Sequence, residues 1–367
     1  MTLSSFPGVY LATTDDPVST RFDIKTLKTI KVEYPNHLPP TLSGCTHWMR
    51  EPGTDNSINI NTKLGLRGPE IVVQRWRPEH SYQDPETVAK FIPNKQSYFH
   101  SFSITENYAV LFLYPVTFDA LKFWKVNFHL MEVIESDPKG RTDIYAINLK
   151  TGEVTHRETS YVFSLHHANA YEDGDELVVD LISNRFENMR DYMKLKDMIN
   201  PPHHRNLSEP NHYDFYRYHI GLHKDYVRAT TFEDVKGVGQ HTFTNHFEFP
   251  TINENYRGKK YCILYGWSSY QQSRQTLVKR NLCNDSLSRT WNDPKFNHYS
   301  TEMSFVPNPE GKSEDDGVLV TNIFDGALEK SYLMVFDAKT FTPLNKAWLP
   351  YAIPYSFHGM YFPEAQF

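Results

Sequence analysis

Short apolar runs bounded by turn residues recur along the chain, whereas stretches with helical periodicity are scarce. The clearest runs are Gly8–Thr13, Tyr108–Tyr114, Asp143–Leu149, Glu176–Ile182, Tyr261–Trp267, Gly317–Ile323 and Tyr332–Phe336. Runs of this length that end at Gly, Pro, Asn or Asp are typical of β-strands. The pattern therefore predicts an all-β protein.

One segment departs from this pattern. Asn184–Ile199, "NRFENMRDYMKLKDMI", has apolar residues at helical spacing and is followed by Pro201 and Pro202. Proline cannot continue a helix, so the segment predicts a strand edge that runs into a helical excursion.

A weak repeat joins several of the expected strands. The stretches "FDIKTLKTI" at Phe22, "INLKTGEVT" at Ile147 and "FDAKTFTPL" at Phe336 share a strand end, an Asp or Asn, one further residue and Lys-Thr, and "LVKRNLCNDSLSRTW" at Leu277 is a degenerate fourth copy. Asp and Asn favour hairpin turns, and hairpins repeated along an all-β chain indicate propeller blades. The alternative is coincidence among common turn sequences.

Composition and charge narrow the class of protein. The chain has 367 residues, a net charge of −6, 22% charged and 39% hydrophobic residues, which is ordinary for a globular protein. The mild acidity argues against nucleic acid as a partner, and no apolar stretch is long enough to span a bilayer. No linker divides the chain, so we expect a single domain over residues 1–367.

The termini and the cysteines suggest a cellular location. The N-terminus, "MTLSSFPGVYLATTDD", has neither the basic region nor the apolar core of a signal peptide. Cys45, Cys262 and Cys283 are widely spaced, with no metal-binding pair and no disulfide framework evident, which fits a reducing compartment. We therefore expect a cytoplasmic protein.

Three histidines share a sequence context. His100, His166 and His358 each lie beside apolar or aromatic residues at a strand end, and His47 in "SGCTHWMREPGT" is a looser fourth case. Neutral imidazole binds Fe, Zn and Cu, and the inner strands of different blades meet at a propeller axis. The alternative for each is a hydrogen-bonded core histidine. Because side chains alternate along a strand, His167 should point away from His166.

Candidate partners for these rings are acidic residues in unusual settings. Glu248 in "FEFPTIN" and Glu302 in "STEMSFV" lie in apolar, aromatic strands, where a free carboxylate would be costly. Asp15 in "TTDDP" is a third candidate, although an exposed turn residue is an equally good interpretation. Metal-bound histidines commonly donate their second N–H to such carboxylates.

At these residues the sequence resembles the carotenoid cleavage oxygenases, in particular the animal branch that includes the retinal pigment epithelium isomerohydrolase. "FHSFSITENYAV" is similar to the family's His-(Asp/Ser)-Phe-x-x-Thr-x-Asn signature, and "LHHANAYED" to its His-x-x-Asn-x-(Tyr/Phe/Trp)-Glu block. "FEFPTINENYRGKKYCILYG", "EDDGVLV" and the terminal "FHGMYF" resemble later blocks in the family's order. The matches extend from Gly8 to Met360, nearly the whole chain.

The resemblance implies a seven-bladed β-propeller with helical and loop insertions that cap one face. It also implies a non-haem Fe(II) on the axis, bound by His47, His100, His166 and His358, with Asp15, Glu248 and Glu302 behind them. Asp15 stands where the family has a longer glutamate. Family members carry a long segment ahead of the Asp15 region, so we expect a propeller that is incomplete at its N-terminus.

The function implied by the resemblance is the cleavage by O2 of a conjugated double bond in a carotenoid or apocarotenoid. Such a substrate is lipid-soluble, and Phe118–Ile134, "FDALKFWKVNFHLMEVI", is a candidate contact with a membrane surface or, alternatively, a buried connection. Three other functions remain open: a retinyl ester isomerohydrolase, an N-terminally truncated non-catalytic carotenoid-binding form, and a propeller scaffold for protein partners.

Overall fold

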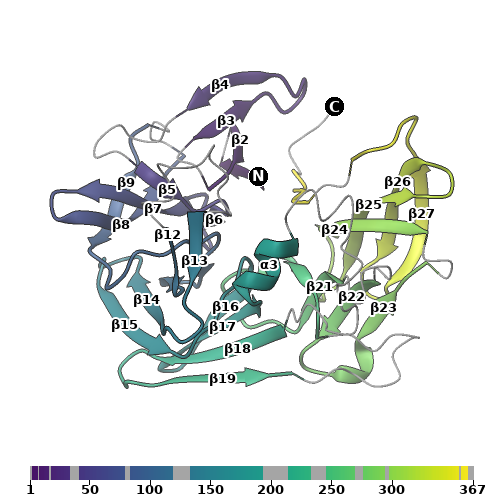
Figure 1. Ribbon diagram of the computed structural model, residues 1–367. Helices are drawn as coiled ribbons and strands as arrows, with labels where there is room; N and C mark the ends of the chain where they lie inside the picture. The colour runs from purple at the N-terminus through teal and green to yellow at the C-terminus, as the bar shows by residue number, and fades with distance from the viewer. Residues whose placement is uncertain are drawn as a thin grey trace.

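The computed structural model describes residues 2–6, 8–15, 18–33, 41–78, 83–118, 133–192, 214–232, 245–268, 276–293, 297–354 and 357–362. Within these residues, six antiparallel sheets follow one another along the chain and are arranged as a ring (Figure 1). The first and the sixth sheet lie on either side of the two chain termini (Figure 1).

Each sheet is built from consecutive strands. The first sheet contains β1 (Thr2–Phe6), β2 (Val9–Thr13), β3 (Ser19–Phe22) and β4 (Thr29–Glu33); the second contains β5 (Thr41–Gly44), β6 (Met49–Arg50), β7 (Ser57–Gly65), β8 (Gly68–Trp76) and β9 (Glu86–Phe91); the third contains β10 (Ser103–Ile104), β11 (Tyr108–Leu113), β14 (Thr142–Asn148) and β15 (Val154–Thr159). The pair β12 (Val116–Phe118) and β13 (Ile134–Ser136) forms a small separate sheet.

The other three sheets have the same order. The fourth contains β16 (His167–Asp173), β17 (Glu176–Ser183), β18 (Asp214–Gly221) and β19 (Val227–Thr231); the fifth contains β20 (Glu248–Thr251), β21 (Ile263–Ser268), β22 (Thr276–Asn281) and β23 (Arg289–Trp291); the sixth contains β24 (His298–Pro307), β25 (Gly317–Asp325), β26 (Lys330–Asp337) and β27 (Thr342–Trp348). Helical structure is limited to α3 (Phe186–Tyr192) and the 3-10 turns η1 (Glu254–Tyr256) and η2 (Asp285–Leu287) in the described residues.

The expected strands are confirmed, and they correspond to β2, β11, β14, β17, β21, β25 and β26. Each is the second or third strand of its sheet and is therefore flanked by neighbours on both edges. The helical excursion is confirmed as α3, which is short; the rest of its predicted range lies outside the described residues.

The four repeat copies are confirmed as the turns that join the third strand of a sheet to the fourth. In three of them the Asp23, Asn148 or Asp337 side chain accepts hydrogen bonds from backbone N–H groups two or three residues later. In the degenerate copy, Asn281 does the same for Cys283 and Asn284. The repeat therefore records local turn chemistry that recurs in the first, third, fifth and sixth sheets.

The hydrophobic core is divided among the interfaces between neighbouring sheets. Large clusters lie between the second and third, third and fourth, fourth and fifth, and fifth and sixth sheets, whereas the cluster between the first and second is centred on Leu11 and Trp76 alone. The first strands of successive sheets also pack side by side, β10 against β16 and β20 against β24. Ring-shaped packing of this kind brings residues distant in sequence to one axis.

Two expectations require correction. The described residues form six propeller sheets instead of seven, and insertions of helix are almost lacking from them. Cys262 and Cys283 form a disulfide, with their Cα atoms 5.3 Å apart. The antiparallel pairing of β21 with β22 places Ile263 opposite Asn281 and so brings Cys262 close to Cys283, which their spacing in the sequence did not reveal.

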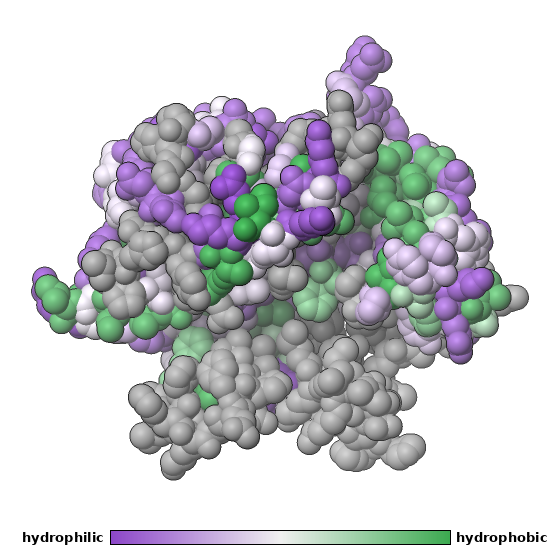
Figure 2. Space-filling view, turned by 90° about the horizontal axis from the view of Figure 1, so that it is seen from above, coloured by the Kyte–Doolittle hydropathy of each residue, from purple (hydrophilic) through white to green (hydrophobic). Residues whose placement is uncertain are grey.

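Apolar side chains are also exposed on the outer part of the sixth sheet. Leu333, Leu344 and Trp348 are at least one-third exposed there, and Figure 2 shows a hydrophobic area on this side of the molecule. Among the described residues, no helix combines the length and apolar character needed to cross a membrane.

Candidate metal centre

Each of the six sheets supplies one polar side chain to a common point on the ring axis. The contributors, in sheet order, are Asp15 after β2, His47 between β5 and β6, His100 before β10, His166 directly before β16, Glu248 at the start of β20 and Glu302 within β24. His358 joins them from a segment after β27 that has no regular secondary structure. All seven residues expected at the site are therefore brought together.

The pairing between neighbouring strands is irregular near three of these residues. The register of β16 with β17 shifts at His167, that of β20 with β21 shifts after Glu248, and that of β24 with β25 shifts between Ser300 and Met303. A β-bulge bends its strand and changes the direction of a side chain. These bulges allow His166, Glu248 and Glu302 to face the axis.

The four histidines present ring nitrogens to one another. The Nε2 atoms of His47 and His100 are 3.2 Å apart, those of His166 and His358 are 3.3 Å apart, and one ligand atom from each ring lies within 4.8 Å of all the others. Five of the six ring-to-ring distances are 4.7–5.3 Å, and the sixth, between His100 and His358, is 6.3 Å. His100 and His358 therefore lie on opposite sides of the centre.

This arrangement fits a transition-metal ion. With metal–nitrogen bonds of ~2.1 Å, adjacent ligands of an octahedron are about 3.0 Å apart and opposite ligands about 4.2 Å. The 3.2 and 3.3 Å separations match those of adjacent ligands, so the four imidazoles would hold one such ion between them. Four neutral imidazoles are a donor set that Fe(II), Zn(II) and Cu(II) accept.

Three of the rings are held from behind by carboxylates. Asp15 Oδ1 and Oδ2 lie 2.9 and 3.0 Å from His100 Nδ1, Glu248 Oε2 lies 2.7 Å from His166 Nδ1, and Glu302 Oε2 lies 3.1 Å from His358 Nδ1. Such a carboxylate fixes the tautomer in which Nδ1 carries the proton and Nε2 is free to coordinate. The shorter Asp15 therefore reaches its histidine.

Burial sets the protonation of the site. It lowers the pKa of His47 and of His166 well below the usual range, and the neighbouring imidazoles lower both further. It raises the pKa of Glu248 to about 8. Burial also opposes ionisation of Asp15, but His100 and hydrogen bonds from Thr46 and Tyr98 lower its pKa overall. Neutral imidazole is the form that binds metal, and a cation on the axis would favour the ionised form of Glu248.

His167 points away from the centre, as predicted. Its Nδ1 lies 2.8 Å from Ser103 Oγ and its Nε2 lies 2.9 Å from the hydroxyl oxygen of Tyr114. Burial lowers the pKa of His167 to about 3, so the ring is neutral. His167 is therefore a buried histidine held by hydrogen bonds, which is the alternative that the sequence left open for each of the four candidate ligands.

Aromatic side chains border one side of the centre. The ring of Phe249 lies 5.3 Å from that of His166 and 5.5 Å from that of His358, and it stacks on Phe357 at 6.1 Å. Phe249 and His358 both have positive φ angles, 53° and 65°. Non-glycine residues in this region carry backbone strain and are concentrated at functional sites.

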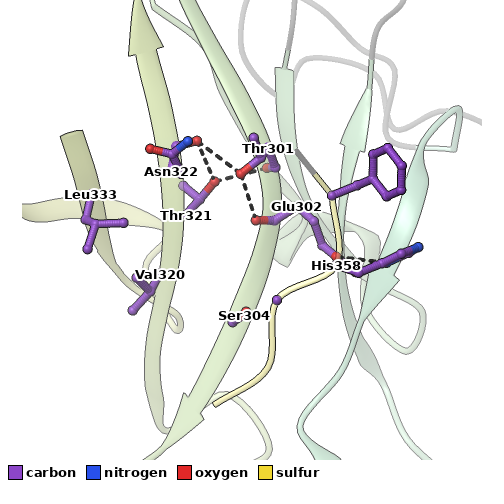
Figure 3. A pocket seen from close by; sticks show the side chains of 10 residues that line it. Thr301, Glu302, Ser304, Val320, Thr321, Asn322, Leu333 and His358 are labelled. Carbon is purple, nitrogen blue, oxygen red and sulfur yellow. Dashed lines mark hydrogen bonds and ion pairs between the residues drawn. The ribbon is translucent and has the colours of Figure 1, made fainter. Parts of the chain in front are cut away.

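A cavity of about 190 Å³ lies beside His358, between the chain end and the sixth sheet (Figure 3). Its lining includes Glu302, Thr301, Asn322 and Leu333, and Figure 3 shows Glu302 and His358 at one side of it. Glu302, behind His358, therefore borders a cavity, whereas Glu248, behind His166, is buried.

Sequence reasoning missed several hydrogen-bonding residues around the site. Thr46 and Tyr98 donate to the two carboxylate oxygens of Asp15, and the Cys45 thiol donates to the backbone oxygen of His100 at 3.0 Å. Their positions within one or two residues of a ligand histidine or its carboxylate are the signal that could have identified Thr46, Cys45 and Tyr98.

Comparisons with known proteins give the relatives of this chain. The family model described as retinal pigment epithelial membrane protein matches residues 1–363. The chain is similar to the mitochondrial carotenoid-cleaving dioxygenase of Mustela putorius furo, with 26% identity over 97% of this chain and 72% of the relative. It is also similar to the beta,beta-carotene 15,15'-dioxygenase of Gallus gallus, with 25% identity over 97% of this chain and 73% of the relative.

Solved structures show the same fold. A variant of the Synechocystis apocarotenoid oxygenase matches with a TM-score of 0.75 and 20% identity over 97% of this chain and 73% of that chain. The match supports a propeller fold for this chain. The family model covers almost every residue of the chain. The chain therefore belongs to the retinal pigment epithelial membrane protein family, which is the family of the carotenoid cleavage oxygenases.

Proposed function

We propose that the protein is an Fe(II)-dependent dioxygenase that cleaves a conjugated double bond of a β-carotene-like carotenoid or an apocarotenoid. The observation that carries this proposal is the cluster of four histidines, three of them backed by carboxylates, at the axis of a propeller. Curated relatives over nearly the whole chain are named carotenoid dioxygenases, which supports the same reaction class.

The donor set fits several transition metals, and the proposed reaction with O2 favours iron among them. His47, His100, His166 and His358 would hold the ion, and a ferrous ion, when bound, supplies the activation of dioxygen. One matched structure, with a TM-score of 0.75 and 20% identity over 97% of this chain and 73% of that chain, is a cobalt-substituted Synechocystis apocarotenoid oxygenase. That protein holds a transition metal on the same fold.

The chain's own residues would position the substrate and exclude water. Phe249, Phe357 and Trp267 form an aromatic wall beside His166 and His358. Aromatic faces suit a flat conjugated polyene, and a water-poor wall protects the reacting double bond from side reactions. Asp15, Glu248 and Glu302 keep the imidazoles oriented, and the cleavage requires no protein nucleophile.

The experiment is anaerobic purification followed by metal analysis and product analysis. We expect near-stoichiometric iron in the wild-type protein, and apocarotenal or retinal products after incubation with β-carotene and O2. His100→Ala should lose the iron. Full retention of iron by His100→Ala, His166→Ala and His358→Ala would contradict the ligand assignment. Retinol formed from a retinyl ester, without consumption of O2, would instead indicate an isomerohydrolase.

We further propose that the protein takes its lipid-soluble substrate from a membrane surface on the cytoplasmic side. Most of the candidate contact, Phe118–Ile134, lies outside the described residues, which omit residues 119–132. Phe118, at its start, is partly exposed. Sedimentation with phospholipid vesicles tests the contact. Thiol labelling of the protein in its cell tests the location: free Cys262 and Cys283 thiols would fit the reducing cytoplasm, whereas a persistent Cys262–Cys283 bond would contradict it.

A further inference from the structure

A single buried hydroxyl links the segments that carry two of the histidines. Ser101 directly follows His100 and is 3% exposed. Its Oγ donates to the backbone oxygen of Leu165 at 2.5 Å and accepts from the backbone N–H of His167 at 3.2 Å. Leu165 and His167 are the two neighbours of His166, so one side chain of the third sheet binds the fourth on both sides of a ligand.

These two hydrogen bonds restrain the backbone of His166. The carbonyl of Leu165 and the N–H of His167 belong to the two peptide groups on either side of the His166 Cα atom. Rotation about that Cα atom would break at least one of the bonds. The remaining carbonyl, that of His166 itself, accepts from Ser164 Oγ and from the N–H of Ile182, each at 3.0 Å. The direction of the imidazole is therefore set by hydrogen bonds to its own backbone.

The same arrangement occurs once more around the axis. The thiol of Cys45, two residues before His47, lies 3.0 Å from the backbone oxygen of His100 and 3.5 Å from that of His47. In both cases a short side chain near one histidine donates a hydrogen bond to the backbone at or next to another: Ser101, after His100, donates to Leu165, and Cys45, before His47, donates to His100. Successive sheets are joined at the points where they deliver ligands.

We propose that Ser101 is a positioning residue of the metal centre, whose hydroxyl fixes the spacing between the His100 and His166 imidazoles. This inference rests on the proposed metal-dependent function. Support around metal-binding histidines typically changes metal affinity by about 10- to 100-fold when it is removed. Ser101 would act on the ligands through the backbone, in addition to the carboxylates that act on their Nδ1 atoms.

Ser101→Ala removes the hydroxyl, and Ser103→Ala is its matched control. Ser103 is equally buried, lies two residues further along the same segment and loses a hydrogen bond to His167, which faces away from the centre. Each variant is loaded anaerobically with Co(II), and its dissociation constant, visible absorption bands and thermal unfolding midpoint are measured. The absorption bands report ligand geometry directly, which a general loss of stability would not alter.

We expect Ser101→Ala to bind Co(II) at least ~10-fold more weakly, with shifted bands. Ser103→Ala should keep wild-type bands and affinity while it loses a similar amount of thermal stability. Ser101→Thr, which keeps the hydroxyl, should restore both the bands and the affinity. The proposal is overturned by wild-type bands and affinity in Ser101→Ala, by equal losses in Ser103→Ala, or by a Thr variant that behaves like the Ala variant. A wild-type protein that takes up no metal would instead overturn the proposed function itself.

Discussion

The histidines reach the axis by two different routes. His100 and His166 lie at the mouths of strands in the third and fourth sheets, and Ser101 joins their segments. His358 comes from a segment without regular structure, has a φ of 65° and lies beside a cavity. Its carboxylate partner is 3.1 Å away, compared with 2.7 Å for His166. The fold therefore places His100 and His166 in advance, whereas the position of His358 depends on how residues 357–362 pack.

Removal of a ligand should have the largest effect and should distinguish the two routes. We expect His166→Ala and His358→Ala each to weaken metal binding by more than ~100-fold, because each removes a direct ligand. His166→Ala should also lower the thermal midpoint more, because His166 joins the fourth sheet to Glu248 of the fifth, whereas the equally buried His358 lies on a segment without regular structure. Metal analysis and calorimetry on both variants test this. Equal loss of stability in the two would contradict the comparison.

Metal removal should loosen the two regions unequally. Without a metal, His358 keeps only its own hydrogen bond and packing, whereas the residues around His100 and His166 keep theirs within the sheets. We expect amide hydrogen exchange to accelerate by at least ~10-fold at residues 357–361 and to change little at residues 165–170. Mass spectrometry of the chelated and loaded protein measures both. Uniform acceleration would show that the metal organises the whole axis.

Substitution of the two glutamates should also distinguish the two regions, with a larger loss of metal affinity at Glu248 than at Glu302. Glu248→Gln should lower metal affinity by about 10- to 100-fold, because the buried Glu248 holds His166 at 2.7 Å. Glu302→Gln should have a smaller effect, because Glu302 is more exposed and its bond to His358 is longer. Titration with Co(II) compares the two matched substitutions. A larger loss of metal affinity in Glu302→Gln than in Glu248→Gln would show that His358 is held more firmly than His166.

A longer side chain at position 15 should perturb the His100 side only slightly. Both oxygens of Asp15 already bond His100, Thr46 and Tyr98, so an added methylene must displace one of these partners. We expect Asp15→Glu to cost about 1 kcal/mol of stability and to weaken metal binding a few-fold. Chemical unfolding and metal titration measure these effects. Unchanged stability with tighter binding would show that the site has room for glutamate.

Reduction of the Cys262–Cys283 disulfide should have the smallest effect on the metal. The bond closes the end of the β21–β22 pair opposite to Trp267, which pairs with Glu248. For a sequence separation of 21 residues, the loss of the cross-link should cost ~3 kcal/mol of stability in the chain-entropy model. Denaturant unfolding of Cys262→Ser with Cys283→Ser measures this. Altered Co(II) bands would show that the bond also shapes the axis.

The strands that sequence reasoning found share a physical property. β11, β14 and β17 are flanked on both edges and bury most of their side chains, so they read as apolar runs, and β25 is flanked on both edges and buries alternate side chains. β7, "SININTKLG", is also buried but is rich in polar residues, and β27 is exposed along its whole length. Both lack the apolar pattern on which the prediction depended.

The sequence by itself determined the β class and the four hairpin turns, because burial and turn chemistry leave local patterns. It offered the seven residues at the axis as candidates, and the family resemblance joined them into one set. The tertiary structure decided which acid holds which histidine, the number of sheets among the described residues, the disulfide and the hydrogen bonds of Ser101. Those contacts join residues up to 192 positions apart, as between His166 and His358. They depend on how the sheets close around the axis, and no local pattern of residues encodes that closure.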